Sequence, residues 1–141
     1  MQSDEFVRRV QEQAGIPVGD AAVDVIEATL ETLGERLAQD KLDGLTAELP
    51  EQLTAYVEKR HKETPVPFDV EEFYNRVAAR SGLSFSTAIR RSHVVMSVLQ
   101  EAVSAGPLRE LRRQLPAEYE ELFTGEPYGP DSPAAALKDS G

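Results

Sequence analysis

Residues 20–37 read DAAVDVIEATLETLGERL, and apolar residues recur through this stretch at every third or fourth position. The steps are four, four, three and four residues, at Ala22, Ile26, Leu30, Leu33 and Leu37. An α-helix turns once in about 3.6 residues, so this spacing places all five side chains on one face. Asp20 is of a residue type that commonly caps a helix at its N-terminus. The stretch therefore predicts a helix of about 18 residues that buries one face.

The same plan is found again in the second half of the chain. A second stripe has the same four steps, at Ala88, Ser92, Met96, Leu99 and Val103. At an offset of 67, residues Phe73, Arg76, Val77 and Gly82 match Phe6, Arg9, Val10 and Gly15. At an offset of 66, Leu115-Pro116 matches Leu49-Pro50. This internal repeat predicts an all-α fold of two tandem pseudo-repeats with about four helices each, packed as one pseudo-twofold helical domain.

Turn signals divide the chain into four segments. The repeated glycines, Gly15 and Gly82, are expected to end helices in the left-handed conformation. A helix break is expected at residues 64–67, TPVP, because proline clashes with the preceding helical turn. Asp69 then acts as an N-cap, with Glu72 completing a capping box. We expect a first repeat at 1–60, a charged, proline-containing linker at 61–70, a second repeat at 71–123 and a disordered tail at 124–141.

Both copies carry a pattern that resembles a known bacterial family. In the first copy it consists of Glu5-Phe6 with Arg9-Val10, ATLETLGERL at 28–37, and Glu48-Leu49-Pro50. In the second copy it consists of Glu72-Phe73 with Arg76-Val77, and RQLPAEY at 113–119 followed by Leu122-Phe123. Over residues 3–123 the chain is similar to the bacterial domain-of-unknown-function family 2267. The resemblance implies an all-helical bacterial protein without an assigned activity, and it supplies no catalytic residues.

Composition limits the classes of function. The 141 residues include 15 basic and 25 acidic side chains, a net charge of −10, which disfavours general binding to nucleic acid phosphates. There is no cysteine, so thiolate metal sites and a cysteine nucleophile are excluded. No apolar run reaches the roughly 18 residues of a membrane helix. The acidic N-terminus does not read as a signal peptide, so we expect a cytoplasmic protein with no membrane association.

A search for reactive groups finds few candidates. The two histidines, His61 and His93, are expected at exposed positions, His61 in the charged linker and His93 on the flank of the second long helix. No metal-ligand pattern or phosphate-binding glycine loop is present, so we expect no cofactor and no metal. We expect a non-enzymatic protein, while an enzyme acting through carboxylates alone remains an alternative.

The outer face of the first long helix is acidic. Its carboxylates follow helical spacing, at Asp20, Asp24, Glu27, Glu31 and Glu35. The equivalent positions of the second copy, at an offset of 66, hold Ser86, Arg90, His93, Ser97 and Glu101. Residues 4–57 hold 4 basic and 12 acidic groups, net −8, whereas residues 71–123 hold 7 of each, net 0. This acidic ridge is interpreted either as a solvated helix face or as a docking surface for a basic partner.

The leading hypothesis is a protein-interaction or regulatory module, with the acidic ridge meeting a basic protein or the arginine-rich half of a second copy as a homo-oligomer. The candidate contact residues are Asp24, Glu27, Glu31, Arg90, Arg91 and His93. A second hypothesis is a small apolar ligand bound between the repeats, with walls formed by Tyr74, Phe85, Met96 and Tyr119. The third is nucleic-acid binding through the second repeat, whose seven basic residues are all arginine.

Overall fold

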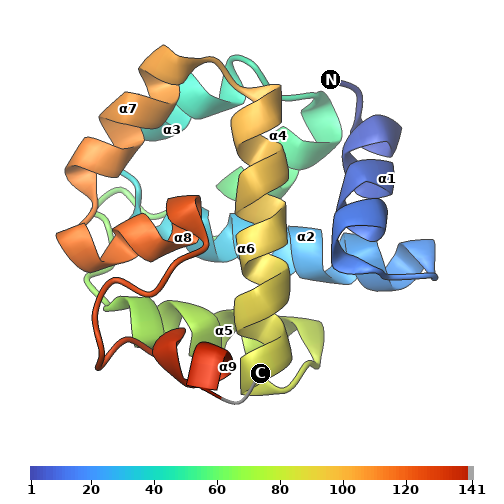
Figure 1. Ribbon diagram of the computed structural model, residues 1–141. Coiled ribbons are helices and arrows are strands. Elements are labelled where there is room, and N and C mark those ends of the chain that lie inside the picture. Colours follow the sequence, from blue (N-terminus) through green and yellow to red (C-terminus); the bar gives the residue numbers. More distant parts are fainter. Residues whose placement is uncertain (140–141) are drawn as a thin grey trace.

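The computed structural model describes residues 1–139, with side chains described to residue 137 (Figure 1). The described residues form helices and contain no strand, so the all-α prediction is confirmed. The first half of the chain contains α1 (Ser3–Ala14), α2 (Gly19–Arg36), α3 (Gln39–Thr46) and α4 (Glu51–Glu58). The second contains α5 (Val70–Ser81), α6 (Phe85–Ala102), α7 (Ala105–Gln114), the 3-10 turn η1 (Ala117–Tyr119), α8 (Glu120–Thr124) and α9 (Ala135–Asp139).

Local signals set several helix ends. Gly15 and Gly82 follow α1 and α5 with φ of 67° and 75°, the left-handed conformation that the sequence predicted. The Asp69 side chain accepts a hydrogen bond from the backbone N–H of Glu72 at 2.8 Å, as expected for an N-cap. The expected cap at Asp20 is wrong, because α2 begins one residue earlier and follows Val18. Asp20 instead places its negative charge in the first turn, where the helix dipole favours it.

Each half contributes to the packing of the other. α1 packs against both long helices, α2 and α6, and α5 also packs against both. α4 covers α2, α8 covers α6, and α3 lies beside α7, as Figure 1 shows at the upper left. All ten residues of the two predicted stripes are buried in one continuous core. The helices of one half therefore complete the core of the other.

The proposed walls of an apolar ligand site belong to this core. Tyr74, Met96 and Tyr119 have no exposed surface, and Phe85 packs against them from the edge. The ring of Phe73 lies edge-on to both tyrosine rings, with centroids 6.2 and 6.0 Å away. These side chains all belong to the second half and pack in or against the core.

The linker is held against the end of α2. The Val66 N–H donates to the Glu35 carbonyl, and the Arg36 guanidinium donates back to the Val66 carbonyl, each at 2.8 Å. His61, which was expected to be exposed, is half-buried, and its Nδ1 lies 3.0 Å from the Gly34 carbonyl oxygen. The last carbonyl groups of α2 lack partners within the helix, so they accept hydrogen bonds from the linker.

The segment after α8 differs from the disordered tail that the sequence suggested. Up to Asp139 this segment lies against the rest of the protein, and it ends in the short helix α9. Ala134 is only 3% exposed, and Ser132 bonds to Glu121 of α8. The last two positions of the expected tail, 140–141, lie outside the described residues.

Across residues 1–139, no helix is both long enough and apolar enough to span a membrane.

Close contact between α2 and α4 depends on Gly34. A Cβ atom at this position would lie 1.9 Å from the Val57 carbonyl oxygen. The equivalent residue of the second copy is Gln100, whose amide donates to the Phe123 carbonyl at 3.0 Å across α6 and α8. In the first half the backbone of Val57 lies directly against Gly34. In the second half the side chain of Gln100 occupies the equivalent space.

We predict that Gly34→Ala lowers the free energy of unfolding by about 3 kcal/mol, because α4 must move away from α2. Urea denaturation followed by circular dichroism measures this. The matched control is Gly44→Ala in α3, where the added Cβ meets only Pro107 Cβ at an ordinary 3.8 Å. The control should keep or gain stability, by up to about 1 kcal/mol, because alanine favours helix. Equal effects of the two substitutions would contradict the close contact.

Candidate functional site

A buried ion-pair cluster joins the two halves. Glu35 of α2 has a side chain only 7% exposed, and Arg76 of α5 donates to it at 2.8 Å. Arg80, one turn further along α5, donates to the other carboxylate oxygen of Glu35 and to the Thr32 hydroxyl. Arg76 also pairs with Glu72 on its own helix at 2.9 Å. Glu35 therefore fixes α5 on α2.

The equivalent residues of the other copy make the same contacts in a more exposed form. Arg9 pairs with Glu5 at 3.2 Å and with Glu101 of α6 at 3.3 Å. Gln13, which corresponds to Arg80, donates to Glu101 at 3.4 Å. The Glu101 side chain is 40% exposed, so water screens this second set of contacts. The repeated arginine and the repeated glutamate thus meet across the two halves in both places.

The acidic ridge is therefore only partly a surface. Glu31 is 3% exposed and pairs with Arg60 at 2.9 Å and with Lys59 at 3.0 Å. Lys59 also reaches Glu27, at 3.1 Å. Glu31 and Glu35 are thus buried and paired within the chain, so the end of the ridge that they form is not a solvated face. Asp24, nearer the start of α2, is exposed.

Buried charge changes the ionisation of Glu31. Burial opposes ionisation, but hydrogen bonds from Arg60 and Lys59 outweigh it and hold the pKa of the Glu31 carboxyl below its ordinary value. The carboxylate is therefore the form that the folded protein favours.

Two grooves lie at equivalent places on the two long helices. The first groove, about 160 Å³, is lined by Asp24, Glu27, Ala28, Glu31, Lys59, Arg60 and Arg80. The second groove, about 250 Å³, is lined by Gln13, His93, Val94, Ser97, Phe123, Thr124 and Gly125. Glu27, Ala28 and Glu31 correspond to His93, Val94 and Ser97 at the offset of 66. Residues of the protein's own ion pairs line the first groove, whereas uncharged groups and His93 line the second.

Two arginines stand at the edge of the second groove. Arg90 and Arg91 line an adjoining hollow of about 340 Å³, which shares Gln13 and Val94 with the groove. Arg90 is exposed and Arg91 half-buried, and neither forms a salt bridge with an acidic residue in the part of the chain that the structure describes. Arg90, His93 and Ser97 follow one another at steps of three and four, along one side of α6. The second groove therefore has uncompensated positive charge at its edge.

His93 is tied to a buried carboxylate rather than lying on an exposed flank as expected. The Tyr74 hydroxyl donates to Glu121 at 2.6 Å, and His93 Nε2 lies 2.7 Å from the same hydroxyl oxygen. Since the tyrosine proton is directed to Glu121, Nε2 carries the hydrogen of this contact and Nδ1 remains an acceptor. Burial lowers the pKa of His93, against smaller opposing effects of Glu121 and Glu126, so the ring is neutral at neutral pH. Burial and the hydrogen bond to Glu121 raise the pKa of Tyr74, which keeps its proton.

Sequence reasoning missed Tyr74 and Glu121 as polar groups of this site. Glu121 is 1% exposed, although glutamate in a short helix reads as a surface residue. The available signal was the contrast with the first repeat, where the equivalent positions hold Val7 and Ala55.

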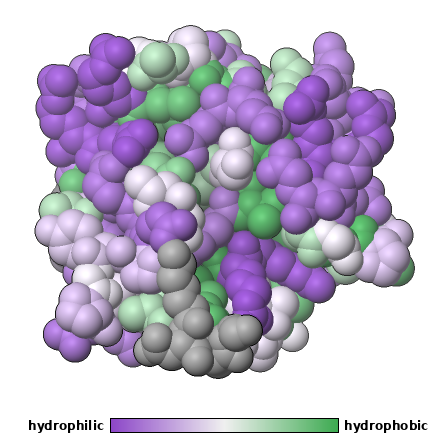
Figure 2. Space-filling view, in the orientation of Figure 1, coloured by the Kyte–Doolittle hydropathy of each residue, from purple (hydrophilic) through white to green (hydrophobic). Residues whose placement is uncertain are grey.

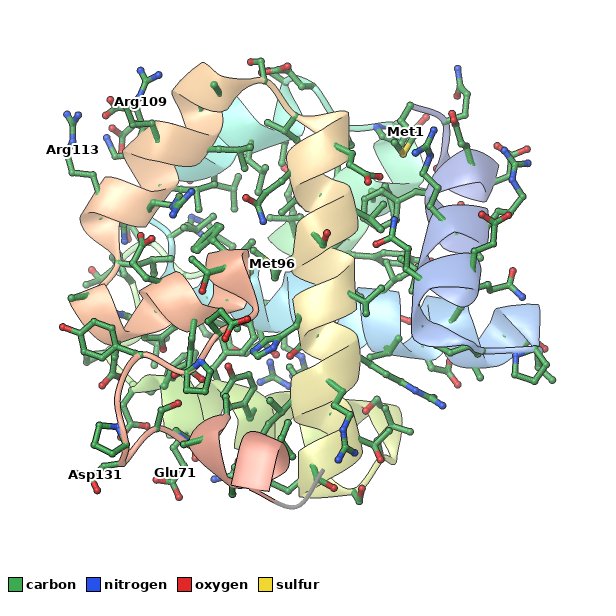
Figure 3. All side chains as sticks on the ribbon, viewed as in Figure 1. Met1, Glu71, Met96, Arg109, Arg113 and Asp131 are labelled. Carbon is green, nitrogen blue, oxygen red and sulfur yellow. The ribbon has the colours of Figure 1, made fainter. Side chains whose placement is uncertain are left out.

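The remaining arginines of the second half are mostly paired. Arg112 bonds to Glu120, and Arg113 lies 3.5 Å from Glu110. Arg109 and Arg113 extend from the outward side of α7, away from the second groove (Figure 3). Figure 2 shows hydrophilic residues over most of this face, with hydrophobic ones in narrow strips between them. The unpaired arginines are thus scattered over two helices. Binding to a nucleic acid backbone requires more basic residues on one surface.

Within residues 1–139, no three His, Cys, Asp or Glu side chains are grouped so that they could hold a metal ion.

Comparison with known proteins gives a family but no activity. A family model described as "Uncharacterized conserved protein (DUF2267)" matches residues 3–122. No curated protein matches the chain.

We predict that Glu35→Gln lowers the free energy of unfolding by about 2 kcal/mol, because Arg76 and Arg80 lose a buried negative partner. Chemical denaturation at neutral pH measures the change. Glu101→Gln is the matched control, since it removes the equivalent but exposed partner of Arg9, and it should change stability little. If both variants lost the same stability, burial of the Glu35 cluster would not be the cause.

The lowered pKa of Glu31 predicts a loss of stability in acid. Its folded-state pKa lies below that of the unfolded chain, so its contribution is present above about pH 4.5 and is lost as the pH falls through the folded-state pKa. The difference in unfolding free energy between the wild type and Glu31→Gln should therefore shrink as the pH is lowered below about 4.5. Denaturation curves across this range measure it, and a constant difference would contradict the prediction.

Proposed function

The chain belongs to the DUF2267 family of uncharacterised conserved proteins, and we propose that it is a non-enzymatic interaction module with a regulatory role. In this proposal the second groove, with Arg90 and Arg91 at its edge, receives an acidic segment of a partner protein. The proposal assumes a bacterial cytoplasmic protein.

The observation that carries the proposal is the contrast between the two grooves. In the first groove, Glu31 is neutralised by Lys59 and Arg60 from the same chain. At the edge of the second groove, Arg90 and Arg91 form no such pair within the described chain. Arginine binds carboxylates in a planar, two-pronged geometry, so these two side chains suit an acidic partner.

We also propose that the two halves are repeats related by a pseudo-twofold axis. Two observations support this proposal. α1 and α5 each pack against both long helices, and the contact of Arg76 with Glu35 recurs as the contact of Arg9 with Glu101. In such an arrangement the inner faces are constrained by mutual packing, and the outer faces are free to diverge. The second groove would then be the one whose residues diverged to bind a partner.

A second copy of the chain is one source of the acidic segment. Asp20 and Asp24 are exposed and have no hydrogen bond or salt bridge to another side chain within residues 1–139. Asp24 and Arg90 occupy equivalent positions with opposite charge. Pairing between copies would match these two surfaces, and oligomeric state distinguishes it from binding to another protein.

We predict that replacing Arg90 and Arg91 together with Glu abolishes partner binding, because like charges then face the acidic segment. The measurement is capture from native lysate at low salt, quantified by mass spectrometry, with sedimentation velocity of the pure protein for self-association. Arg109→Glu is the control, since Arg109 is exposed on the outward side of α7 and should retain the captured proteins. If the double variant captures the same proteins and sediments as the wild type does, the proposed binding role of the second groove is wrong.

A further inference from the structure

The C-terminal segment at residues 126–137, here called the strap, lies on the body with most of its residues exposed or half-buried. Ser132 donates its hydroxyl proton to Glu121, and the Tyr128 N–H lies 3.4 Å from the same carboxylate oxygen. Ala134 is buried, and Leu137 packs partly against the core. In Figure 1 the strap, drawn in red, leaves α8 and passes the start of α5, where a hollow of about 350 Å³ remains beneath it. A segment with so little buried surface opens at low cost in free energy.

The strap and the second groove share one buried carboxylate. One oxygen of Glu121 accepts from the strap, and the other accepts from Tyr74. Tyr74 in turn holds His93, which lines the groove. A chain of hydrogen bonds thus runs from Ser132 to the groove through groups that are buried or half-buried.

We propose that the strap is a segment that can detach from the body. Its docking or release regulates the second groove through the Glu121–Tyr74–His93 chain of hydrogen bonds. With the strap docked, His93 is held neutral and presents only an acceptor, Nδ1, to the groove. With the strap released, His93 takes up a proton at Nδ1 and adds a third cation beside Arg90 and Arg91. The inference deepens the proposed function and rests on it for the identity of the groove as a binding surface.

The direction of this effect follows from the surroundings of His93. Tyr74 faces it from α5, Glu121 from α8 and Glu126 from the start of the strap, while α1 brings only the neutral Gln13. Burial is the largest influence on the pKa of His93 and lowers it. Release of the strap admits water to Glu121 and Tyr74, which relieves that burial. Moving Glu126 away acts in the opposite sense, but its influence is the smaller one.

Binding and release are then coupled in both directions. An acidic ligand in the groove favours the protonated ring and therefore the open strap. The docked strap, by the same coupling, weakens binding of the acidic ligand. The protein would bind its partner most strongly where something else captures the strap or where the pH is mildly acidic.

The test uses the full chain with a strap that cannot dock. Ala134→Asp places a charge at a position 3% exposed and should release the strap, whereas Ala136→Asp adds the same charge at an exposed position and should not. Ser132→Ala is a milder second variant, which removes only the hydroxyl donor to Glu121. The dispersion of backbone amide signals in NMR spectra checks that each variant is folded.

The first readout is the titration of the His93 imidazole ring by NMR. The midpoint for His93 should rise by about half a pH unit or more in Ala134→Asp, and by less in Ser132→Ala. It should stay unchanged in Ala136→Asp. An unchanged His93 midpoint in both strap variants overturns the coupling.

The second readout is binding of a capped oligo-glutamate peptide by calorimetry at about pH 6. Ala134→Asp should bind about two- to fivefold more tightly than the wild type, and His93→Gln in the same background should remove the gain. If His93 shifts but no peptide binds any variant, the coupling stands and the proposed function fails. If peptide binds equally to all variants and His93 does not shift, the proposed function stands and the coupling fails.

Discussion

The carboxylate of Glu35 lies between Arg76 and Arg80, and the position of α5 on α2 depends on it. A carboxylate with 7% exposure is stable only with partners, because removal from water costs more than a single weak contact returns. Two arginines one turn apart satisfy both of its oxygens, which fixes the register of α5 as well as its distance. The linker depends on the same place, since the backbone carbonyl of Glu35 accepts from Val66.

Arg36 extends this cluster toward the second half. Its guanidinium lies over the rings of Phe68 and Tyr119, 5.5 and 5.2 Å from their centroids, and bonds to the Val66 carbonyl. The cation is thereby held by aromatic faces and a carbonyl where a carboxylate would ordinarily be expected. Arg76 lies over the ring of Phe68, 4.1 Å from its centroid. The two arginines thus hold one linker residue and join α2, the linker and α5 into one unit.

The positions of the two halves that match at the offset of 66 differ in charge and burial. Charge has been internalised in the first half, where Glu31 and Glu35 are both buried. In the second half, the equivalent positions hold Ser97 and Glu101, both exposed, and the buried acid is instead Glu121. A buried carboxylate therefore belongs to the surroundings of each groove, but Glu31 is paired with Lys59 and Arg60 in one half, whereas Glu121 supports His93 through Tyr74 in the other. This difference, rather than a reactive cluster, is what the proposed binding role uses.

Periodicity and local backbone preference predicted the long helices, but they predicted neither the first residue of α2 nor the short helix α9. The two stripes gave the long helices and their buried faces, and Gly15 and Gly82 gave the ends of α1 and α5, because helical spacing and left-handed glycine act within a few residues. The fates of Glu31, Glu121 and His93 could not be read in this way. Glu31 and His93 lie off the stripes of the long helices, and Glu121 lies on a short helix without one. Each contacts residues distant in sequence: Lys59 and Arg60 for Glu31, and Tyr74 for the other two. The sequence thus determined which face of each helix turns inward, and the tertiary structure decided which outer charges are covered, because covering requires a second element whose approach no local pattern encodes.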